Sequence, residues 1–344
     1  MASRRRVIQV LPLGQVRALD LTAAWRAIRS RIDCDGELVP PVFLPSHSFR
    51  SSRGQHDADK LLDFLFERLD PKVMRIIGVT AADLFAEGRN FVFGYAHMRD
   101  RIAVVSTHRL RELYWGRPDH EGLLGARIDK AVAHEIGHTF HVPHCENATC
   151  VMHHVEFLWQ LDELGRDYCE GCASMVSAAS CRGVDDPETL FQLAGSYMRR
   201  HRLVRAVATY AAATEGAPGN PHYHNDHGVA LLAIGNRPGA ARAFQRALEL
   251  SPGSPQPYYN LGIVCRERGD VASADFFFGE ALKREPDLPN GLRYLGILHQ
   301  DHFFDPIRAR HYLSRYQAVR RDDHEVARRL CALAGEDSDQ VRGA

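Results

Sequence analysis

The sequence predicts an α+β domain, with a mixed sheet packed on helices, followed by an all-helical repeat domain. Three observations lead to this prediction. Strand-like and helix-like segments alternate over about the first 125 residues, residues 126–172 are rich in His and Cys, and the chain after about residue 187 repeats with a period of 34. We predict domains at 1–175 and 188–335, a linker of small and polar residues at 176–187, and a C-terminal tail at 336–344.

The first region contains the segments expected to build the sheet and its helices. Apolar residues recur at helical spacing over Ala58–Leu69, which predicts a helix there. Short apolar or β-branched runs predict strands at Val7–Leu11, Val39–Leu44, Val73–Val79, Phe91–Gly94 and Ile102–Ser106. Strands that alternate with helices are typical of a sheet layered against helices.

The last region repeats four kinds of residue at intervals of 34. Small residues stand at Ala194, Gly228, Gly262 and Gly296, aromatic residues at Tyr210, Phe244, Phe278 and Tyr312, alanines at Ala213, Ala247 and Ala281, and prolines at Pro218, Pro252 and Pro286. A helix–turn–helix unit of this length and pattern is the signature of the tetratricopeptide repeat (TPR). The small residues let paired helices approach, the aromatic residue fills the gap, and the proline ends the second helix. We therefore predict an all-α TPR solenoid, whose fourth unit, around 290–320, is a cap.

Composition argues against two classes of partner. Lys and Arg total 43 and so do Asp and Glu, which gives no electrostatic basis for binding nucleic acid or an anionic membrane surface. The sequence contains no run of 18 apolar residues, so we predict no membrane span. The N-terminal segment MASRRRVIQVLPLG lacks the long apolar core of a signal peptide. We expect a cytoplasmic protein, and nothing in the sequence indicates its oligomeric state.

The segment HEIGHTFHVPHC, residues 134–145, has the spacing of a metal site carried by a helix. His134 and His138 are four residues apart, so both lie on one helical face and can bind one metal ion, with Glu135 beside them. His144 can become a third ligand only if the chain turns back after the helix. Three histidines leave an open position for water, which is the arrangement of a catalytic zinc, and Glu135 would then shuttle the proton.

Four of the eight cysteines fall within 28 residues and are spaced as C-x4-C and C-x2-C: Cys145, Cys150, Cys169 and Cys172. In a reducing compartment this clustering favours a metal over disulfides. The spacing suits a closed tetrahedral structural zinc site, which would hold the segment after the active-site helix. The scattered cysteines, Cys34, Cys181, Cys265 and Cys331, are expected to be buried thiols.

The run from His134 to Met152, followed by C169-x2-C172, resembles the archaemetzincin (archaelysin) family of zinc peptidases. The resemblance extends upstream through RGQHDAD from Arg53, IGVTAADLF from Ile77 and NFVFG from Asn90, and it covers most of residues 5–175. It implies a metzincin-like peptidase domain with two zinc ions and with Glu135 as general base and acid. It also implies Met152 in a Met-turn beneath the metal. The implied ligands are His134, His138 and His144 for the catalytic zinc, and Cys145, Cys150, Cys169 and Cys172 for the second, structural zinc.

One position departs from the family pattern. The family usually has Gly three residues after the second His, where the chain turns left-handed, and here the residue is His141. His at positive φ is tolerated at a cost of about 1–2 kcal/mol. If the helix continued, His141 would share its metal-facing side and would replace His144, but Pro143 disfavours helical geometry at Val142. We predict that His144 is the ligand and that His141 caps the helix.

Two classes of function follow from these residues. The first is hydrolysis of peptide or protein substrates by zinc-activated water, with the TPR domain recruiting a protein partner or substrate. The second is a TPR adaptor whose histidine site is weak or empty because of His141. A TPR domain that covers the cleft and inhibits the peptidase is a further arrangement. The presence of Glu135 with all three histidines favours the first function.

Overall fold

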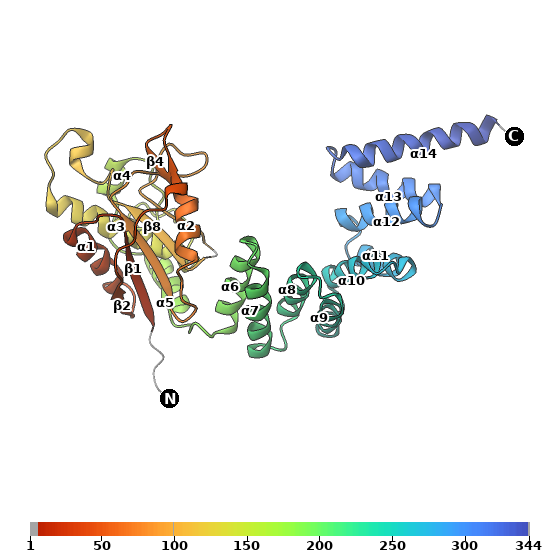
Figure 1. Ribbon diagram of the computed structural model, residues 1–344, viewed down its shortest axis with the longest axis horizontal. Coiled ribbons are helices and arrows are strands. Elements are labelled where there is room, and N and C mark those ends of the chain that lie inside the picture. Colours follow the sequence, from red (N-terminus) through yellow and green to blue (C-terminus); the bar gives the residue numbers. More distant parts are fainter. Residues whose placement is uncertain (1–5, 99, 343–344) are drawn as a thin grey trace. The chain divides into compact units, whose positions relative to one another are not determined.

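A five-stranded sheet forms the centre of the first of two units in the computed structural model, which describes residues 6–98 and 100–342 (Figure 1). The units are Met1–Ser196 and Tyr197–Ala344. The strand order is β2-β1-β5-β8-β7, with bounds β1 Val7–Leu13, β2 Asp35–Leu38, β5 Arg75–Thr80, β7 Gly94–Ala96 and β8 Ile102–Ser106. Neighbouring strands from β2 to β8 are parallel, and β7 runs antiparallel to β8. The predicted mixed sheet is therefore confirmed.

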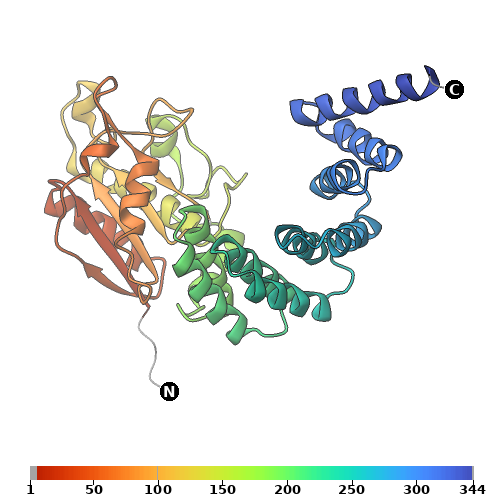
Figure 2. The same cartoon turned by 45° about the vertical axis from the view of Figure 1, so that its right-hand side comes forward.

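Helices cover both faces of this sheet. Ile77 and Val79 of β5 share a core with α1 (Ala18–Arg29) and α3 (Glu121–Thr139). Because strand residues alternate between faces, Gly78 points to the opposite side, where Leu65 of α2 (Ala58–Phe66) packs against it. In Figure 2 the orange helix α2 lies in front of the sheet. The strands β5 and β8 are buried on both faces, which explains their unbroken apolar sequence.

Shorter elements complete the first unit. A second sheet has the order β3-β4-β6, with bounds β3 Phe49–Arg50, β4 Gln55–Asp57 and β6 Leu84–Phe85, and two 3₁₀ turns lie at η1 Ser46–Ser48 and η2 Glu112–Trp115. Strand β4 leads directly into α2, whose N-cap Asp57 accepts a hydrogen bond from the Asp59 amide at 3.2 Å. Helices α4 (Leu158–Glu163) and α5 (Glu170–Ser180) follow α3.

Three sequence-based assignments in this unit need correction. The strand predicted at Val39–Leu44 lies instead at Asp35–Leu38, because Pro40 and Pro41 have no amide hydrogen for a ladder; of the predicted segment, Val42 forms an isolated bridge to Leu13. The strand predicted at Phe91–Gly94 begins only at Gly94, as β7. Helix α1 was not predicted; small alanines form much of its buried face.

Antiparallel helix pairs build the second unit, as the 34-residue period predicts (Figure 2). Helix α6 Pro187–Arg199 crosses the boundary after Ser196, and the helices that follow in the second unit are α7 Leu203–Gly216, α8 Pro221–Ala233, α9 Arg237–Leu250, α10 Pro255–Glu267, α11 Val271–Arg284, α12 Pro289–Asp301, α13 Pro306–Val319 and α14 His324–Arg342. A Cβ atom on Gly228 would lie 2.5 Å from the Phe244 ring, and one on Gly262 would lie 2.6 Å from the Phe278 ring. The predicted pairing of small and aromatic residues in a TPR solenoid is therefore confirmed.

The fourth repeat is shifted by one residue. Gly296 packs against Leu313 and not against Tyr312, since the loop before α13 is one residue longer than the corresponding loop before α11. Tyr312 instead stacks on His299, with ring centroids 5.7 Å apart. The packing of an aromatic ring against the small residue of the same repeat therefore does not extend to the fourth repeat.

Helices extend into the segments that the sequence assigned to linker and tail. Helix α5 reaches Ser180, within the predicted linker 176–187, and α6 begins at Pro187 in the first unit. Helix α14 continues to Arg342 through the predicted tail 336–344, and residues 343–344 lie outside the described residues. Across residues 6–98 and 100–342, no helix combines the length and the apolar character needed to cross a lipid bilayer.

Candidate active site and metal centres

The helix that carries the HEIGH segment, α3, is buried along most of its length, and its charged residues are paired. Arg127 donates to both carboxylate oxygens of Asp162 at 2.6 Å. Lys130 donates to the carbonyl oxygen of Asp162 at 2.8 Å, and Asp129 accepts from Arg31 at 2.7 Å. The contacts of Arg127 and Lys130 hold the end of α4 against α3, so the chain that follows α3 returns along it.

The end of α3 has the hydrogen bonds of a Schellman motif. The amide of Val142 donates to the Gly137 carbonyl at 3.1 Å, and the amide of His141 donates to the His138 carbonyl at 2.9 Å. His141 has φ 65°, which is the left-handed conformation that Gly usually provides. The predicted helix end and the left-handed turn at His141 are confirmed, and the chain then reverses towards His144.

The three predicted histidines converge. One ring nitrogen from each of His134, His138 and His144 lies within 4.8 Å of the others. Nδ1 of His134 lies 2.8 Å from the Val151 carbonyl oxygen, and Nδ1 of His138 lies 2.8 Å from that of Val142. Since a carbonyl only accepts, each Nδ1 carries the proton and each Nε2 offers a lone pair. The Nε2 atoms of His134 and His138 are 3.0 Å apart, so their lone pairs point to one shared position.

The electrostatic environment keeps these rings neutral. Burial, together with the neighbouring His138, lowers the pKa of His134 to about 3. The same two causes lower the pKa of His144 to about 4. Burial also lowers the pKa of His138. Neutral imidazole is the form of histidine that binds metal ions, so the site is set for a cation.

Glu135 lies on α3 beside the histidines and faces the edge strand β7. A Cβ atom on Gly94 would lie 2.4 Å from Cγ and 2.8 Å from Oε1 of Glu135, so only glycine allows this approach. Burial raises the pKa of Glu135 to about 8, while the charge of Arg89 acts in the opposite direction. The sequence singled out Glu135 but not Gly94, whose only signal is a glycine inside a strand-like segment.

Met152 lies against α3. Its side chain is fully buried, and a Cβ atom on Gly137 would lie 2.4 Å from its Sδ atom. The amide of His153 donates to the Cys150 carbonyl at 2.8 Å, which closes a tight turn with Met152 inside it. The same turn presents the Val151 carbonyl to His134, so this turn and the first histidine are positioned together.

The four clustered cysteines also converge. Their Sγ atoms lie within 4.8 Å of one another, and those of Cys145 and Cys169 are 3.8 Å apart. The amides of Met152 and Cys169 point at the sulfur of Cys150, at 3.5 and 3.3 Å. Cys169 is the N-cap residue of α5, and the amide of Cys172 lowers its pKa to about 7. Amide donors directed at sulfur stabilise thiolates, which are the metal-binding form, whereas burial raises the pKa of Cys150 and of Cys172.

The other cysteines do not behave as the sequence suggested. Cys181 and Cys331 are exposed, and Cys34 and Cys265 are partly buried, so the expectation of buried thiols is wrong for the first two. Both exposed residues lie near helix ends or on a terminal helix, where a single apolar side chain need not face a core.

His154 lies next to one of the three convergent histidines. Its ring centroid lies 4.6 Å from that of His144. It does not belong to the convergent set of three, and its Nε2 is 3.8 Å from the carboxylate of Glu156. Its position next to His144 comes from the turn after Met152, which spacing alone does not reveal.

The strain at residue 141 can be measured by comparing His141→Gly with His141→Ala. Both changes remove the ring, but only alanine must still adopt φ near 65° against its preference. We expect the glycine variant to be more stable than the alanine variant by about 1 kcal/mol, which is about 2–4 °C in Tm for a domain of this size. Differential scanning calorimetry of the zinc-loaded chain measures this difference. Equal Tm values would contradict a left-handed residue 141.

Several known proteins are similar to this chain. Residues 29–178 match peptidase family M54. An archaemetzincin of Pyrococcus furiosus is 34% identical over 187 residues, which are 52% of this chain and 96% of that protein. An archaemetzincin of Haloquadratum walsbyi is 32% identical over 173 residues, 49% of this chain and 99% of that protein. The solved archaemetzincin structure of Methanopyrus kandleri is 28% identical and covers 53% of this chain and 99% of its own, with a TM-score of 0.47. Both archaemetzincin relatives match about half of this chain over nearly their whole length. The chain therefore belongs to the archaemetzincin family of zinc metallopeptidases.

Proposed function

We propose that this chain hydrolyses peptide bonds at a zinc ion held by His134, His138 and His144, with Glu135 as the general base. The observation that carries the proposal is the convergence of the three rings beside a buried carboxylate. A tetrahedral zinc with bonds of about 2.05 Å places its nitrogen ligands about 3.3 Å apart, and the 3.0 Å between two Nε2 atoms is close to this value. When bound, zinc supplies a Lewis acid that makes water acidic and polarises a carbonyl group.

In this proposal the protein groups orient the substrate and move the proton. Strand β7 pairs with β8 on one side, and an extended peptide can add to its other edge in antiparallel or parallel fashion. Gly94 on that strand contacts Glu135, so a peptide paired there would lie next to the carboxylate. Glu135 accepts the proton of the attacking water and returns it to the leaving amine. Met152 packs under the histidines as the Met-turn residue.

We propose a second, structural zinc at Cys145, Cys150, Cys169 and Cys172. A tetrahedral site with zinc–sulfur bonds of about 2.3 Å has sulfur atoms about 3.8 Å apart, and Cys145 and Cys169 are at 3.8 Å. All four residues belong to the segment that contains His144 and Met152 or to the start of α5. This zinc would therefore fix the loop that completes the catalytic site.

We further propose that the TPR unit recruits peptide or protein substrates. Its helix pairs form a repeat array of the kind that presents an extended binding surface, and the archaemetzincin relatives correspond only to the first half of the chain. Recruitment would then raise kcat/KM for substrates that contact the repeats, without a change in the catalytic groups.

Zinc content and hydrolysis together test the peptidase proposal. We expect about two zinc ions per chain by mass spectrometry of metals, and about one in His138→Ala, because a closed four-cysteine site is independent of that ring. His302→Ala, which removes an exposed histidine of the second unit, should keep both. Cleavage of a peptide library should stop with a chelator and return with zinc.

A different result would favour the adaptor function. One zinc per chain in the unmodified protein, retained in His138→Ala and lost in a cysteine variant, would mean that the histidine site does not bind zinc. Absence of cleavage with two zinc ions bound would instead contradict the proposed chemistry at an intact site.

A further inference from the structure

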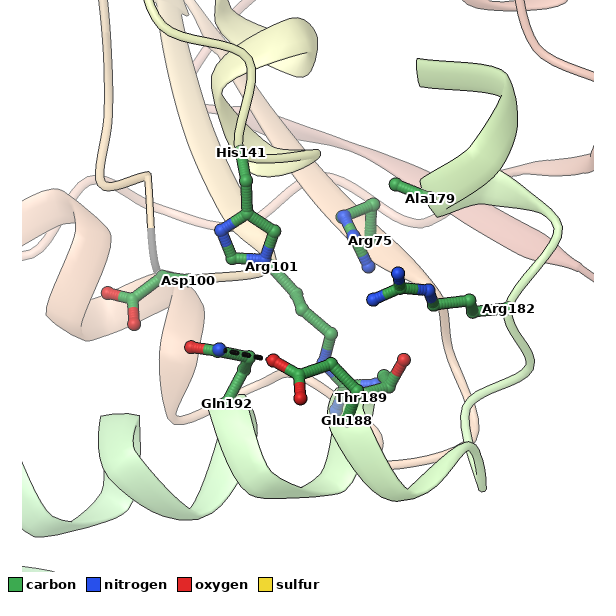
Figure 3. A pocket seen from close by; sticks show the side chains of 9 residues that line it. All are labelled: Arg75, Asp100, Arg101, His141, Ala179, Arg182, Glu188, Thr189 and Gln192. Carbon is green, nitrogen blue, oxygen red and sulfur yellow. Dashed lines mark hydrogen bonds between the residues drawn. The ribbon is translucent and has the colours of Figure 1, made fainter. Parts of the chain in front are cut away.

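A positively charged recess lies at the end of α3, away from the three convergent histidines (Figure 3). Arg75, Arg101, Arg182 and His141 line it, together with the carboxylates of Asp100 and Glu188. All lining residues belong to the first unit, and the recess has a cavity volume of about 30 Å³. The catalytic groups proposed above take no part in it.

Arg75 is the central observation. Its side chain is buried, with 5% of the residue exposed, and its hydrogen bonds go to neutral oxygens only: the carbonyl and hydroxyl of Thr139 at 3.1 and 3.2 Å and the Met74 carbonyl at 2.6 Å. Among the described residues, no carboxylate accepts a hydrogen bond from it. Burial and the charge of Arg101 lower its pKa to about 9. A buried guanidinium without a counter-ion is costly, so this group is suited to receive an anion.

The surrounding charges strengthen this conclusion. Figure 3 shows the guanidinium of Arg182 turned towards that of Arg75, with the His141 ring on the same side of the recess. The charges of Arg75 and Arg182 both lower the pKa of His141, after burial, which is the largest cause. Asp100 accepts a hydrogen bond from Ser196, and Glu188 accepts one from Gln192 at 2.7 Å. The charge of Arg101 also acts on Arg75, and like charges gathered in one recess repel unless an anion lies among them.

We propose that this recess binds a small oxyanion, such as inorganic phosphate or a free carboxylate group, between Arg75, Arg182 and His141. The planar fork of a guanidinium matches two oxygens of a phosphate or carboxylate at once. A lysine cluster would supply charge without this geometry. The proposal concerns a second site and does not depend on the proposed hydrolysis.

The site is connected to the end of the active-site helix. Nε of Arg75 donates to Thr139, the last residue of α3, and its guanidinium lies 4.2 Å over the ring of Phe140, the C-cap residue. His141, which lines the recess, is the left-handed residue that turns the chain towards His144. An anion bound here would stabilise this turn. The glycine that the family usually has at this position offers no ring to an anion. In this proposal His141 therefore contacts the anion in addition to ending the helix.

Calorimetric titration of the zinc-loaded full chain with phosphate, against chloride at equal ionic strength, tests the proposal. We expect saturable binding at one site per chain, with an increase in Tm on saturation. Arg182→Gln, an exposed position, should weaken binding by about tenfold or more, because one of two forks is lost. Arg26→Gln is the matched control, since Arg26 is an exposed arginine of α1 in the same unit.

Separate arms distinguish the two ligand sources. Binding of phosphate and sulfate but not of acetate, dependent on Arg182, would assign a tetrahedral oxyanion. Binding of acetate with the same dependence would assign a carboxylate group. Absence of saturable binding for all three, or binding that Arg182→Gln and Arg26→Gln retain equally, would overturn the proposal. The second result would place the anion elsewhere, for example at the zinc.

Discussion

Glu135→Gln is expected to lower kcat/KM for peptide hydrolysis by about 10²–10⁴-fold, because glutamine has the same shape but cannot accept the proton of the attacking water. The side chain is buried and its Cγ and Cδ atoms lie against Gly94, so the amide should occupy the same space. Zinc content should stay at about two per chain, because Glu135 is not one of the convergent ligands. Initial rates on a cleaved peptide and metal analysis of the same sample give both values.

The matched control is Glu163→Gln, which removes an exposed carboxylate from α4 in the same unit. Its activity should equal that of the unmodified protein. Cleavage by Glu135→Gln at the unmodified rate, with zinc bound, would show that another group accepts the proton. Loss of zinc in Glu135→Gln would show that the carboxylate supports the metal and not the proton transfer.

Cys172→Ser is expected to remove the structural zinc and much of the stability of the first unit. Structural zinc sites contribute apparent binding energies of about 10–16 kcal/mol in small zinc domains, and a hydroxyl does not replace a thiolate ligand. Cys172 is buried, and the cluster joins the start of α5 to Cys145, which is adjacent to His144. Release of this segment should displace His144 and Met152, so the catalytic zinc should be lost as well. The expected result is fewer than one zinc per chain with a lower Tm.

Cys181→Ser is the control for this experiment. Cys181 is an exposed cysteine at the C-cap of α5, outside the cluster. It should keep both zinc ions and an unchanged Tm. If Cys172→Ser also kept two zinc ions and the original Tm, the four cysteines would not form a structural metal site.

Local spacing was enough to predict most of the candidate site and the repeat architecture. His134 and His138 face one direction because residues four apart on a helix share a face, and this holds in any fold that keeps the helix. The 34-residue period predicts paired helices because each repeat contacts mainly its neighbours, so Gly228 and Phe244 meet within one unit. The strands predicted at Val7–Leu11 and Ile102–Ser106 followed from short apolar runs, and the structure has them at Val7–Leu13 and Ile102–Ser106.

Features that depend on the exact register of a loop were predicted less well. The edge of the sheet near Pro40 shifted because proline cannot donate to a ladder, and the fourth repeat shifted because one added loop residue moves Leu313 into the place of Tyr312. Apolar periodicity does not predict the strand shift or the repeat shift, because it depends on the spacing of apolar residues and not on hydrogen bonds or loop lengths.

The sequence by itself determined which residues make up the candidate site and the repeats: the three histidines, the carboxylate, the four cysteines and the repeat period all follow from spacings of a few to 34 residues. Only the tertiary structure decided how they are used. It placed Gly94 against Glu135 and buried Arg75 beside His141, pairs that are 41 and 66 residues apart in the chain. Such contacts depend on how the sheet, α3 and the returning loop pack together. Because a spacing rule applies within one helix or one repeat, it does not reach across these elements.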